Sequence, residues 1–442
     1  MSRDPNTSLR RLLENCGWSG AQLAHAIRTV AAEQSACFGC DRSTVARWLA
    51  GTQPRPPAGT FLLEALSRRL DRPVTAEEAG LTRAPAQMTP PSWESDPVRT
   101  LARLTSAEAD PERRHLLAGA VFSLAALTLP DTLHARPPVP ARPATPTARH
   151  PGQPEVDELD AMADVFAAAA ALHGGEHTRP ALAAYLHHVA LPQLHAPTAI
   201  HDQLLSATAR LTLLLGLMCA DSGHDATAQY YHHTAAQLAA EADDHTSLAL
   251  ALRIMASHAH DLGHHHPAVL HLAHAATEHA RHAPPAIRAF THAQLAVLQA
   301  HHHRHDALNT LTRAEQLHTC SDAPPGPFTT YPLAALHYQR AQTLATLGDS
   351  LAAARALNAS LAARSPTERH ATALTHAAYA ELLHRIDRLD QALAHWSTFT
   401  TLYPTLNSAR AKRRLHTMRQ QLTPHRHHPD TRAFLAQTAH LL

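Results

Sequence analysis

Apolar side chains recur at helical spacing through the first eighty residues of the chain. Ser19 and Gln22 also form the pattern of a capping box, which favours the start of a helix. The sequence therefore predicts four short helices, each with one apolar stripe, packed as a compact bundle. The stripes are Leu9, Leu12, Leu13 and Cys16; Leu23, Ile27, Val30 and Ala31; Val45, Trp48 and Leu49; and Leu63, Leu66 and Leu70.

The third helix, within the sequence DRSTVARWLAG (41–51), is the most informative stretch of the chain. Asp41 can accept the free amide hydrogens of a first helical turn, and Gly51 is a typical helix stop. Val45 and Trp48 share one face, which leaves a polar set facing outward. That set suits a DNA major groove, where arginine can read guanine through two hydrogen bonds. Its members are Arg42, Ser43, Thr44 and Arg47.

Beyond residue 154 the chain has the pattern of repeated helical hairpins. A small residue opens the second helix of each hairpin at spacings of 40, 39, 46 and 39 residues, and glycines suited to tight turns precede three of them. A hairpin buries only one face against itself, so neighbouring hairpins must stack. We therefore expect an all-α chain whose C-terminal part is an α-solenoid of tetratricopeptide-like hairpins. The positions are Ala228, Ala268, Ala307, Ala353 and Ala392, with Gly223, Gly263 and Gly348.

Composition marks the domain boundaries. The stretch 135–154 holds seven prolines and almost no large apolar residue, so we expect an extended, semi-rigid linker. The prediction has four regions. They are a helix-turn-helix bundle at 1–81, a connecting region at 82–134 with an apolar helix at 113–130, the linker at 135–154, and the solenoid at 155–442.

Charge and motif content exclude several classes of function. Residues 1–80 hold ten arginines against eight acidic residues, so no strong basic footprint is present. The longest apolar run, 116–129, is too short to span a bilayer, and five cysteines do not predict a disulfide framework. No GxSxG, HExxH, Walker or GxGxxG motif occurs. We expect a cytoplasmic protein that is not an enzyme and has no cofactor or membrane contact.

Three patterns keep alternatives open. Arg113 and Arg114 before the apolar run mimic a twin-arginine export signal, although such signals act at the N-terminus. Cys37 and Cys40 have the spacing of half a zinc site, with no second CxxC. Histidine clusters fall at equivalent turns of successive hairpins, where they can bind a transition metal or sense pH. Histidine-rich composition explains them more simply, so we expect no metal. The clusters are His264 to His266, His301 to His303 with His305, and His425 with His427 and His428.

The N-terminal motifs resemble the actinobacterial branch of the lambda-repressor-like (Xre-type) helix-turn-helix family, in which a tetratricopeptide-like region follows such a domain. The resemblance rests on LRRLLENCGWSGAQLAHAI (9–27), DRSTVARWLAGTQPRPP (41–57), LLEALSRRL (62–70) and RRHLLAGAVFSLAALTLP (113–130). The stretch from Thr29 to Cys40 is longer than the turn of a minimal helix-turn-helix. The resemblance implies that Gln22 contacts a DNA phosphate, that Arg42, Ser43, Thr44 and Arg47 enter the groove, and that Val45 and Trp48 belong to the core.

These patterns together predict a sequence-specific DNA-binding transcriptional regulator that binds double-stranded DNA as a homodimer. Its solenoid would receive a peptide, protein or small-molecule signal on the concave surface formed by the first helices. The alternative is an interaction scaffold with a vestigial or protein-binding helix-turn-helix module, and a histidine-rich metal sensor is a third reading. The candidate partner-binding residues are Arg210, Arg253, Arg288, Gln294, His337, Arg340 and His376.

Overall fold

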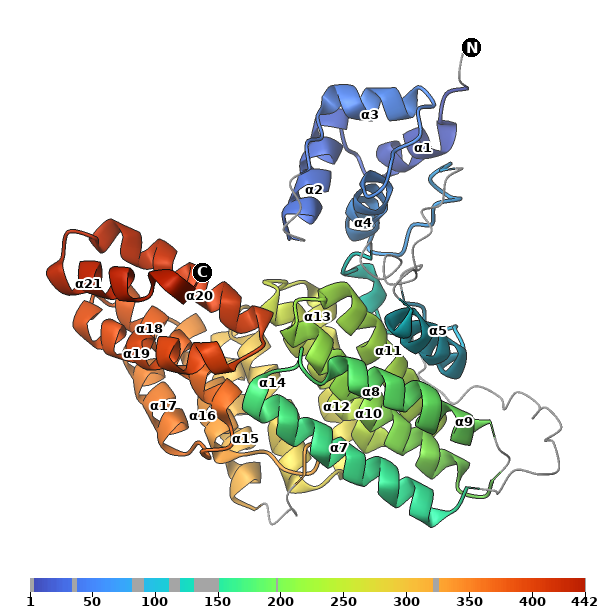
Figure 1. Cartoon of the computed structure of the whole chain (residues 1–442). Coiled ribbons are helices and arrows are strands. Elements are labelled where there is room, and N and C mark those ends of the chain that lie inside the picture. The colour runs from blue at the N-terminus through green and yellow to red at the C-terminus, as the bar shows by residue number, and fades with distance from the viewer. Residues whose placement is uncertain are drawn as a thin grey trace.

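The computed structural model describes residues 4–33, 38–81, 91–110, 120–130, 151–195, 198–320 and 326–441. Within these ranges every regular element is a helix, so the all-α prediction is confirmed. A small N-terminal unit of four helices stands on a larger array of helices, as Figure 1 shows.

The N-terminal unit buries almost all of the residues that the helical spacing selects. Leu49, Leu63 and Leu70 are only partly buried, whereas α4 buries Phe61 and Leu62, which lie outside the predicted stripe. The buried set of α4 is wider because this helix packs against α1 and α2 and also meets the segment that follows α5. The helices are α1 (Thr7–Asn15), α2 (Gly20–Glu33), α3 (Arg42–Leu49) and α4 (Ala58–Leu70).

The C-terminal array consists of consecutive helix pairs that pack against one another, in a solenoid-like arrangement. The predicted turn glycines Gly223, Gly263 and Gly348 have φ of 80°, 84° and 86°, a conformation that glycine adopts without strain. The predicted small residues Ala228, Ala307, Ala353 and Ala392 are 0% exposed, and Ala268 is partly buried. The main hairpins are α10 (His201–Asp221) with α11 (Asp225–Glu241), α12 (His245–Asp261) with α13 (Pro267–His279), α14 (Pro285–Gln299) with α15 (Arg304–Thr319), α16 (Leu333–Thr346) with α17 (Ser350–Ala362), and α18 (Arg369–Arg385) with α19 (Leu389–Leu402).

Shorter or terminal elements flank these hairpins. Before them come α7 (Gln153–His173), α8 (Arg179–Tyr185), the π-helical turn η2 (Leu186–Ala190) and α9 (Leu191–Leu194). Among and after them lie η3 (Ala280–His282), η4 (Tyr403–Thr405), α20 (Ala409–Leu422), η5 (Thr423–His425), α21 (Pro429–Gln437) and η6 (Ala439–Leu441).

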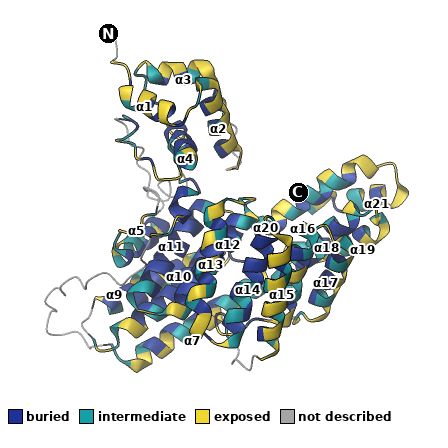
Figure 2. Cartoon of the chain, turned by 180° about the vertical axis from the view of Figure 1, so that it is seen from behind, coloured by how far each residue is buried: buried dark blue, intermediate teal, exposed yellow. Residues whose placement is uncertain are grey.

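Helix α10 forms the centre of the array. It is the one helix in the described ranges that is long and apolar enough to cross a bilayer, but 78% of its most apolar window is buried inside the structure. Figure 2 shows α10 and α11 in the colour of buried residues along most of their length. The apolar composition of α10 is therefore accounted for by its position in a protein core.

The connecting region differs from the prediction. The one regular element within residues 120–130 is a short 3₁₀ helix, η1 (Ala125–Leu127), so the predicted helix is wrong over these residues. Residues 113–119 lie outside the described ranges. We call residues 120–130 the strap. Val121 belongs to the core of the N-terminal unit, whereas Phe122 and Leu127 belong to the core of the array. The run is apolar because two bodies bury it, and not because it is one face of a helix.

A helix that the sequence analysis did not identify, α5 (Pro97–Ala109), also joins the array. It begins after an N-cap, Asp96, and buries Leu101 and Leu104 against α11 and α8. The array therefore starts before the predicted linker. Most of that linker, residues 135–150, lies outside the described ranges.

The last helices of the array return to its beginning, because α18 packs against α7. The Asn407 amide donates to the carbonyl of His173 at 2.7 Å. The carboxylate of Asp221, at the end of α10, accepts from Gly175 N at 2.8 Å and Ser408 Oγ at 2.6 Å, and lies 3.0 Å from His370 Nε2. Residues nearly 190 positions apart thus close the array, and a cavity lies inside it.

Candidate functional site

The first candidate site is the exposed face of α3. Asp41 caps the helix, because one carboxylate oxygen accepts from Thr44 N at 2.8 Å and from the hydroxyls of Thr44 and Ser43 at 2.7 and 2.9 Å. These bonds, the one from the Thr44 side chain first, lower the pKa of Asp41 to about 2. The cap is therefore charged at neutral pH and fixes the start of the helix, as the sequence predicted.

The cap changes what the predicted contact residues can offer to DNA. The hydroxyl hydrogens of Ser43 and Thr44 are engaged by Asp41. Arg42 and Arg47 are exposed, and among the described residues only one nitrogen of Arg47 is bonded, to Thr44 Oγ1 at 3.1 Å. A guanidinium has five donor hydrogens, so both arginines keep donors for base edges or phosphates.

The opposite face of α3 is sealed against its own unit. Val45 is 0% exposed and Trp48 is 6% exposed. In Figure 1, α3 lies on the side of the N-terminal unit that faces away from the array, whereas α4 lies toward it. The predicted combination of an open polar face and a buried apolar face is therefore present.

Gln22, at the start of α2, forms the predicted capping box. Its side-chain oxygen accepts from Ser19 N at 2.8 Å, and its own amide donates to Ser19 Oγ at 3.3 Å. The side chain is exposed, so its amide nitrogen remains available for a phosphate oxygen. The capping box thus holds Gln22 in the first turn of α2. The family resemblance implies a phosphate contact for this residue.

The candidate zinc half-site receives little support. Helix α2 continues to Glu33, and Cys37 lies outside the described ranges. Cys40 is 4% exposed, and burial raises the pKa of its thiol, which disfavours the thiolate that a zinc ion requires. The guanidinium of Arg28 donates to the carbonyl of Cys40, so this short segment instead positions the start of α3.

The strap joins the N-terminal unit to the array. Leu124 N donates to the buried carboxylate of Glu64 on α4 at 3.0 Å. Ser123 N donates to Gln229 Oε1 of α11 at 2.8 Å, and Gln229 Nε2 donates back to Ser123 O at 2.6 Å. Directly before these anchors, the Phe122 ring is 1% exposed. The strap therefore bonds to both bodies through two consecutive residues.

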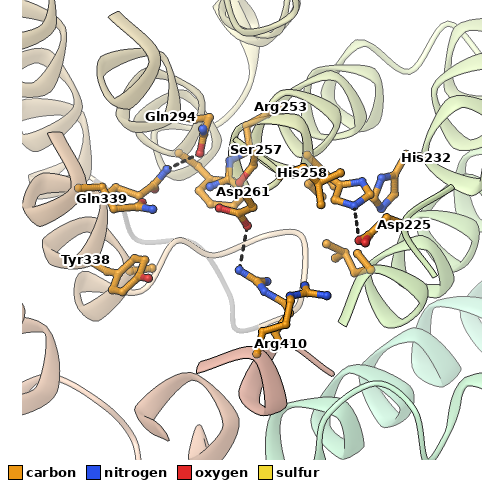
Figure 3. A pocket seen from close by; sticks show the side chains of 18 of the residues that line it. Asp225, His232, Arg253, Ser257, His258, Asp261, Gln294, Tyr338, Gln339 and Arg410 are labelled. Carbon is orange, nitrogen blue, oxygen red and sulfur yellow. Dashed lines mark hydrogen bonds and ion pairs between the residues drawn. The ribbon is translucent and has the colours of Figure 1, made fainter. Parts of the chain in front are cut away.

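The second candidate site is a cavity of about 210 Å³ inside the closed array. Its walls come mainly from α10, α11, α12, α14 and α16, and α20 closes it. Figure 3 labels lining side chains from α11, α12, α14, α16 and α20. The lining includes four arginines and two aspartates, so it carries a positive balance. The charged members are Arg253, Arg364, Arg410, Arg413, Asp225 and Asp261.

Both aspartates of the cavity are paired. Asp261 lies 2.8 Å from Arg410, and Asp225 lies 3.1 Å from His258. Burial would raise the pKa of Asp261, but Arg410, His260 and His258 together outweigh that effect, so the pKa is lowered. In the described part of the chain no carboxylate lies within ion-pair distance of Arg253 or Arg413. These two guanidiniums are the source of the unbalanced positive charge.

Arg253 is held in an apolar position. Its guanidinium carbon lies 3.7 Å from the centre of the Phe290 ring, and its Nε has no hydrogen-bond partner among the described residues. Burial lowers the pKa of Arg253 to about 10, so it stays charged at neutral pH. A partly buried cation that stacks on one face and lacks an anion is a ready partner for a carboxylate or phosphate.

Two of the predicted partner-binding residues line this cavity. They are Arg253 and Gln294, and Gln339 Nε2 donates to Gln294 Oε1 at 2.9 Å. The other five do not line it. Arg210 pairs with Asp160 at 2.5 Å, Arg340 pairs with Glu315 at 2.8 Å, His376 lies 2.9 Å from His395, and Arg288 and His337 lie outside the lining. These five side chains lie on faces of their helices that do not line the cavity.

Basic side chains from beyond the first helices of the hairpins also line the cavity and were not predicted from the sequence. Arg410 and Arg413 come from α20, and Arg364 follows α17. The arginine-rich stretch of α20 was the one available signal, but only closure of the array brings it to the cavity. His258 was also not predicted from the sequence; it lines the cavity and lies near the strap, with 5.3 Å between the centres of its ring and the Phe122 ring.

Comparison with known proteins bears on the N-terminal unit alone. Residues 9–82 match the family described as the SP15 N-terminal domain. The match begins in α1 and ends directly after Leu81, a core residue of this unit, so it coincides with the N-terminal unit. No curated protein matches the chain.

Proposed function

We propose that this protein is a sequence-specific DNA-binding regulator whose array binds a small anionic ligand. The observation that carries the proposal is α3, a capped helix with Arg42 and Arg47 exposed on one side and Val45 and Trp48 buried on the other. This division lets a helix enter a major groove without exposing its apolar face.

The arginines of α3 can supply only a modest free energy of discrimination between DNA sequences. A bidentate contact between arginine and guanine contributes about 1–3 kcal/mol of discrimination. Two such contacts per unit are few for a specific site, and the N-terminal unit has little excess positive charge. We therefore propose a homodimer that places two copies of α3 about 34 Å apart on successive turns of one DNA face.

The cavity supports a small ligand better than a folded partner. Its volume of about 210 Å³ is below the roughly 300–1,000 Å³ of drug-sized ligand pockets, so it fits a small anion or a chain end. Arg253 and Arg413 supply the charge, and Gln294 supplies a polar side chain on the wall. A carboxylate is the chemistry that a planar guanidinium binds most specifically.

The strap provides a physical route from the cavity to the N-terminal unit. His258 lines the cavity, pairs with Asp225 and contacts Phe122 of the strap. A ligand that moved His258 would change the packing of Phe122 and so the position of the N-terminal unit on the array. Such a ligand regulates only if it favours one arrangement over another, since equal affinity for both shifts nothing.

The proposal is tested by selecting DNA from a random-sequence library with the purified full-length chain. We expect an enriched motif with two half-sites, and loss of that enrichment in Arg47→Ala. Arg99→Ala is the matched control, because Arg99 lies on α5 and is 83% exposed. A parent protein that enriches no sequence would refute the proposal.

One observation favours a second candidate, an interaction scaffold. Arginines of the N-terminal unit are used internally: Arg68 pairs with Glu64 and Glu33, and Arg69 donates to the carbonyl of Cys16. This leaves fewer cations for DNA than the composition suggests. Stable protein partners together with no enriched DNA sequence would favour the scaffold.

A further inference from the structure

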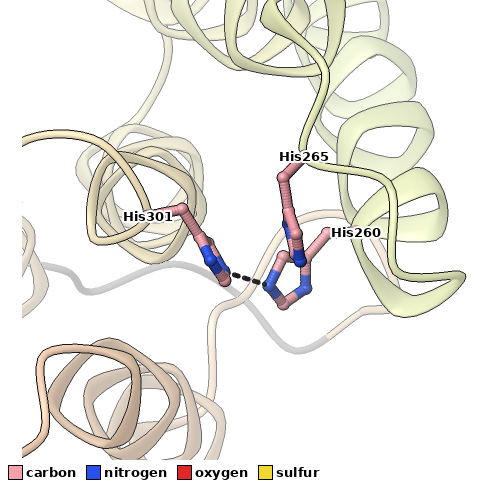
Figure 4. A group of neighbouring side chains, drawn as sticks. All are labelled: His260, His265 and His301. Atoms are coloured by element: carbon pink, nitrogen blue, oxygen red, sulfur yellow. Dashed lines mark hydrogen bonds between the residues drawn. The ribbon is translucent and has the colours of Figure 1, made fainter.

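Three histidines from two neighbouring hairpins converge on one point at the edge of the array. His260 ends α12, His265 lies in the turn after it, and His301 lies in the equivalent turn after α14. One ring nitrogen from each lies within 4.8 Å of the other two. Figure 4 shows the three side chains reaching toward one another. The turn positions of this cluster follow from the hairpin repeat, which stacks successive turns side by side.

We propose that His260, His265 and His301 form a binding site for a divalent transition metal, with zinc as the fitting ion. Three neutral imidazoles are a typical donor set for zinc, with a fourth position open to water. Nothing in the proposed regulation requires this site, so the two proposals stand separately.

The distance between the facing nitrogens of His260 and His301 is close to the ligand–ligand distance of a zinc site. Zinc–nitrogen bonds of about 2.0–2.1 Å in a tetrahedron place ligand nitrogens about 3.3 Å apart. His260 Nε2 and His301 Nε2 are 3.1 Å apart. The His265 ring now stacks on His301 at 3.8 Å between centres, so it must turn to direct a nitrogen at the ion. His265 is exposed in a turn, where such a rotation is inexpensive.

The surroundings of His260 support the same assignment. The Asp261 carboxylate lies 3.8 Å from His260 Nδ1, which leaves Nε2 as the nitrogen that faces His301. A metal-bound histidine usually donates its second ring hydrogen to a carboxylate, and the 3.8 Å to Asp261 must shorten to form that hydrogen bond. Two imidazole nitrogens 3.1 Å apart need either one shared hydrogen or a cation between them, and a metal ion satisfies all three rings at once.

Metal binding would fix a turn that touches the N-terminal unit. His264, beside His265, stacks on Phe122 with ring centres 5.4 Å apart. His266, on the other side, lies 3.8 Å from the Asp71 carboxylate after α4. A metal that cross-links this turn to His301 should therefore slow hydrogen exchange in residues 263–266 and in the adjoining strap.

The test is a titration of the untagged full-length chain with Zn²⁺ in competition with a chromophoric chelator. We expect one tight site per chain, and separate His260→Ala, His265→Ala and His301→Ala variants should each weaken it more than about 10-fold, since even outer-shell changes cost 10- to 100-fold. Co²⁺ in the same site should give the visible absorption of tetrahedral coordination, and the variants should lose it.

Two controls separate this site from other histidines. His305→Ala removes an exposed histidine just beyond the cluster and should leave the affinity unchanged. His428→Ala tests a second, fully exposed group of His428 with Asp390 and Asp430 and should also have no effect. Far-UV circular dichroism confirms folding of each variant. Absence of a tight stoichiometric site, or its survival in all three cluster variants, would overturn the proposal.

Discussion

Closure of the array depends on one buried carboxylate, so Asp221→Asn should loosen the junction between its two ends. The Asp221 side chain is 8% exposed and has partners from three separate segments, Gly175, His370 and Ser408. Burial alone would raise the pKa of Asp221, but these partners, His370 first, lower it. The charged form is therefore the one that the closed array stabilises.

The magnitude follows from the number and type of these bonds. A hydrogen bond to a charged group contributes roughly 1.5–3 kcal/mol, against roughly 0.5–1.5 kcal/mol for a neutral one. In Asp221→Asn, the amide NH₂ group would also face one of the groups that now donate to the carboxylate, so that hydrogen bond would be lost. Losing the charge at two or three bonds should cost about 2–4 kcal/mol. Because the folded-state pKa is lowered, the difference should hold above about pH 4 and shrink as the pH falls below it.

The assay is urea denaturation together with hydrogen exchange. We expect faster exchange of the Asn407 amide, which bonds to His173 across the same junction. Asp160→Asn is the matched control, because Asp160 pairs with Arg210 at 2.5 Å but is 47% exposed, and exposed pairs contribute about 0–1 kcal/mol. Equal effects of the two substitutions would refute the reasoning, since burial is what distinguishes them.

Three further outcomes are expected. Phe122→Ala should lower the free energy of unfolding by about 3–5 kcal/mol and speed hydrogen exchange throughout the strap, because this ring is 1% exposed between His258 and His264. Unchanged hydrogen exchange would contradict the anchoring role of Phe122. Burial lowers the pKa of His233 to about 4, so this side chain is protonated in the unfolded chain before it is protonated in the folded one as the pH falls. The free energy of unfolding should therefore fall by about 3 kcal/mol between pH 6.5 and 4. His233→Gln should flatten that part of a stability–pH curve, and a curve identical to the parent's would argue against it. In Trp48→Ala, the N-terminal unit should unfold in a separate transition at lower temperature in calorimetry, because the buried ring is removed. A single transition at the parent's temperature would show that this ring does not hold α3 against its unit.

Local features of the fold followed directly from the sequence. The cap of α3 at Asp41, the capping box of Ser19 and Gln22, and the turn at Gly263 depend on residues close together in the chain. The stripe with Val45 also follows from helical spacing alone. In each case one short-range rule determines the conformation, so no knowledge of the tertiary structure was required.

Features that depend on contacts between distant segments could not be read from the sequence. The strap around Phe122 has the composition of a buried helix, and only its position between two bodies explains why these apolar residues are buried without an α-helix. Arg410 reaches the cavity because the array closes on itself. Side chains such as Arg340 were assigned to the concave surface by helix order, but which face a side chain occupies depends on how neighbouring hairpins pack.

The exposed polar face of α3 is the centre of this account, and it is tested most directly by discrimination between DNA sequences. Binding of the parent and of an Arg42→Ala, Arg47→Ala double variant would be measured by fluorescence anisotropy on an enriched site and on a scrambled one, at fixed salt. We predict that the double variant loses about 2–6 kcal/mol per half-site of the difference between the two DNA sequences, while it retains binding to scrambled DNA. An undiminished difference in the double variant would contradict the assignment of α3 as the reading helix.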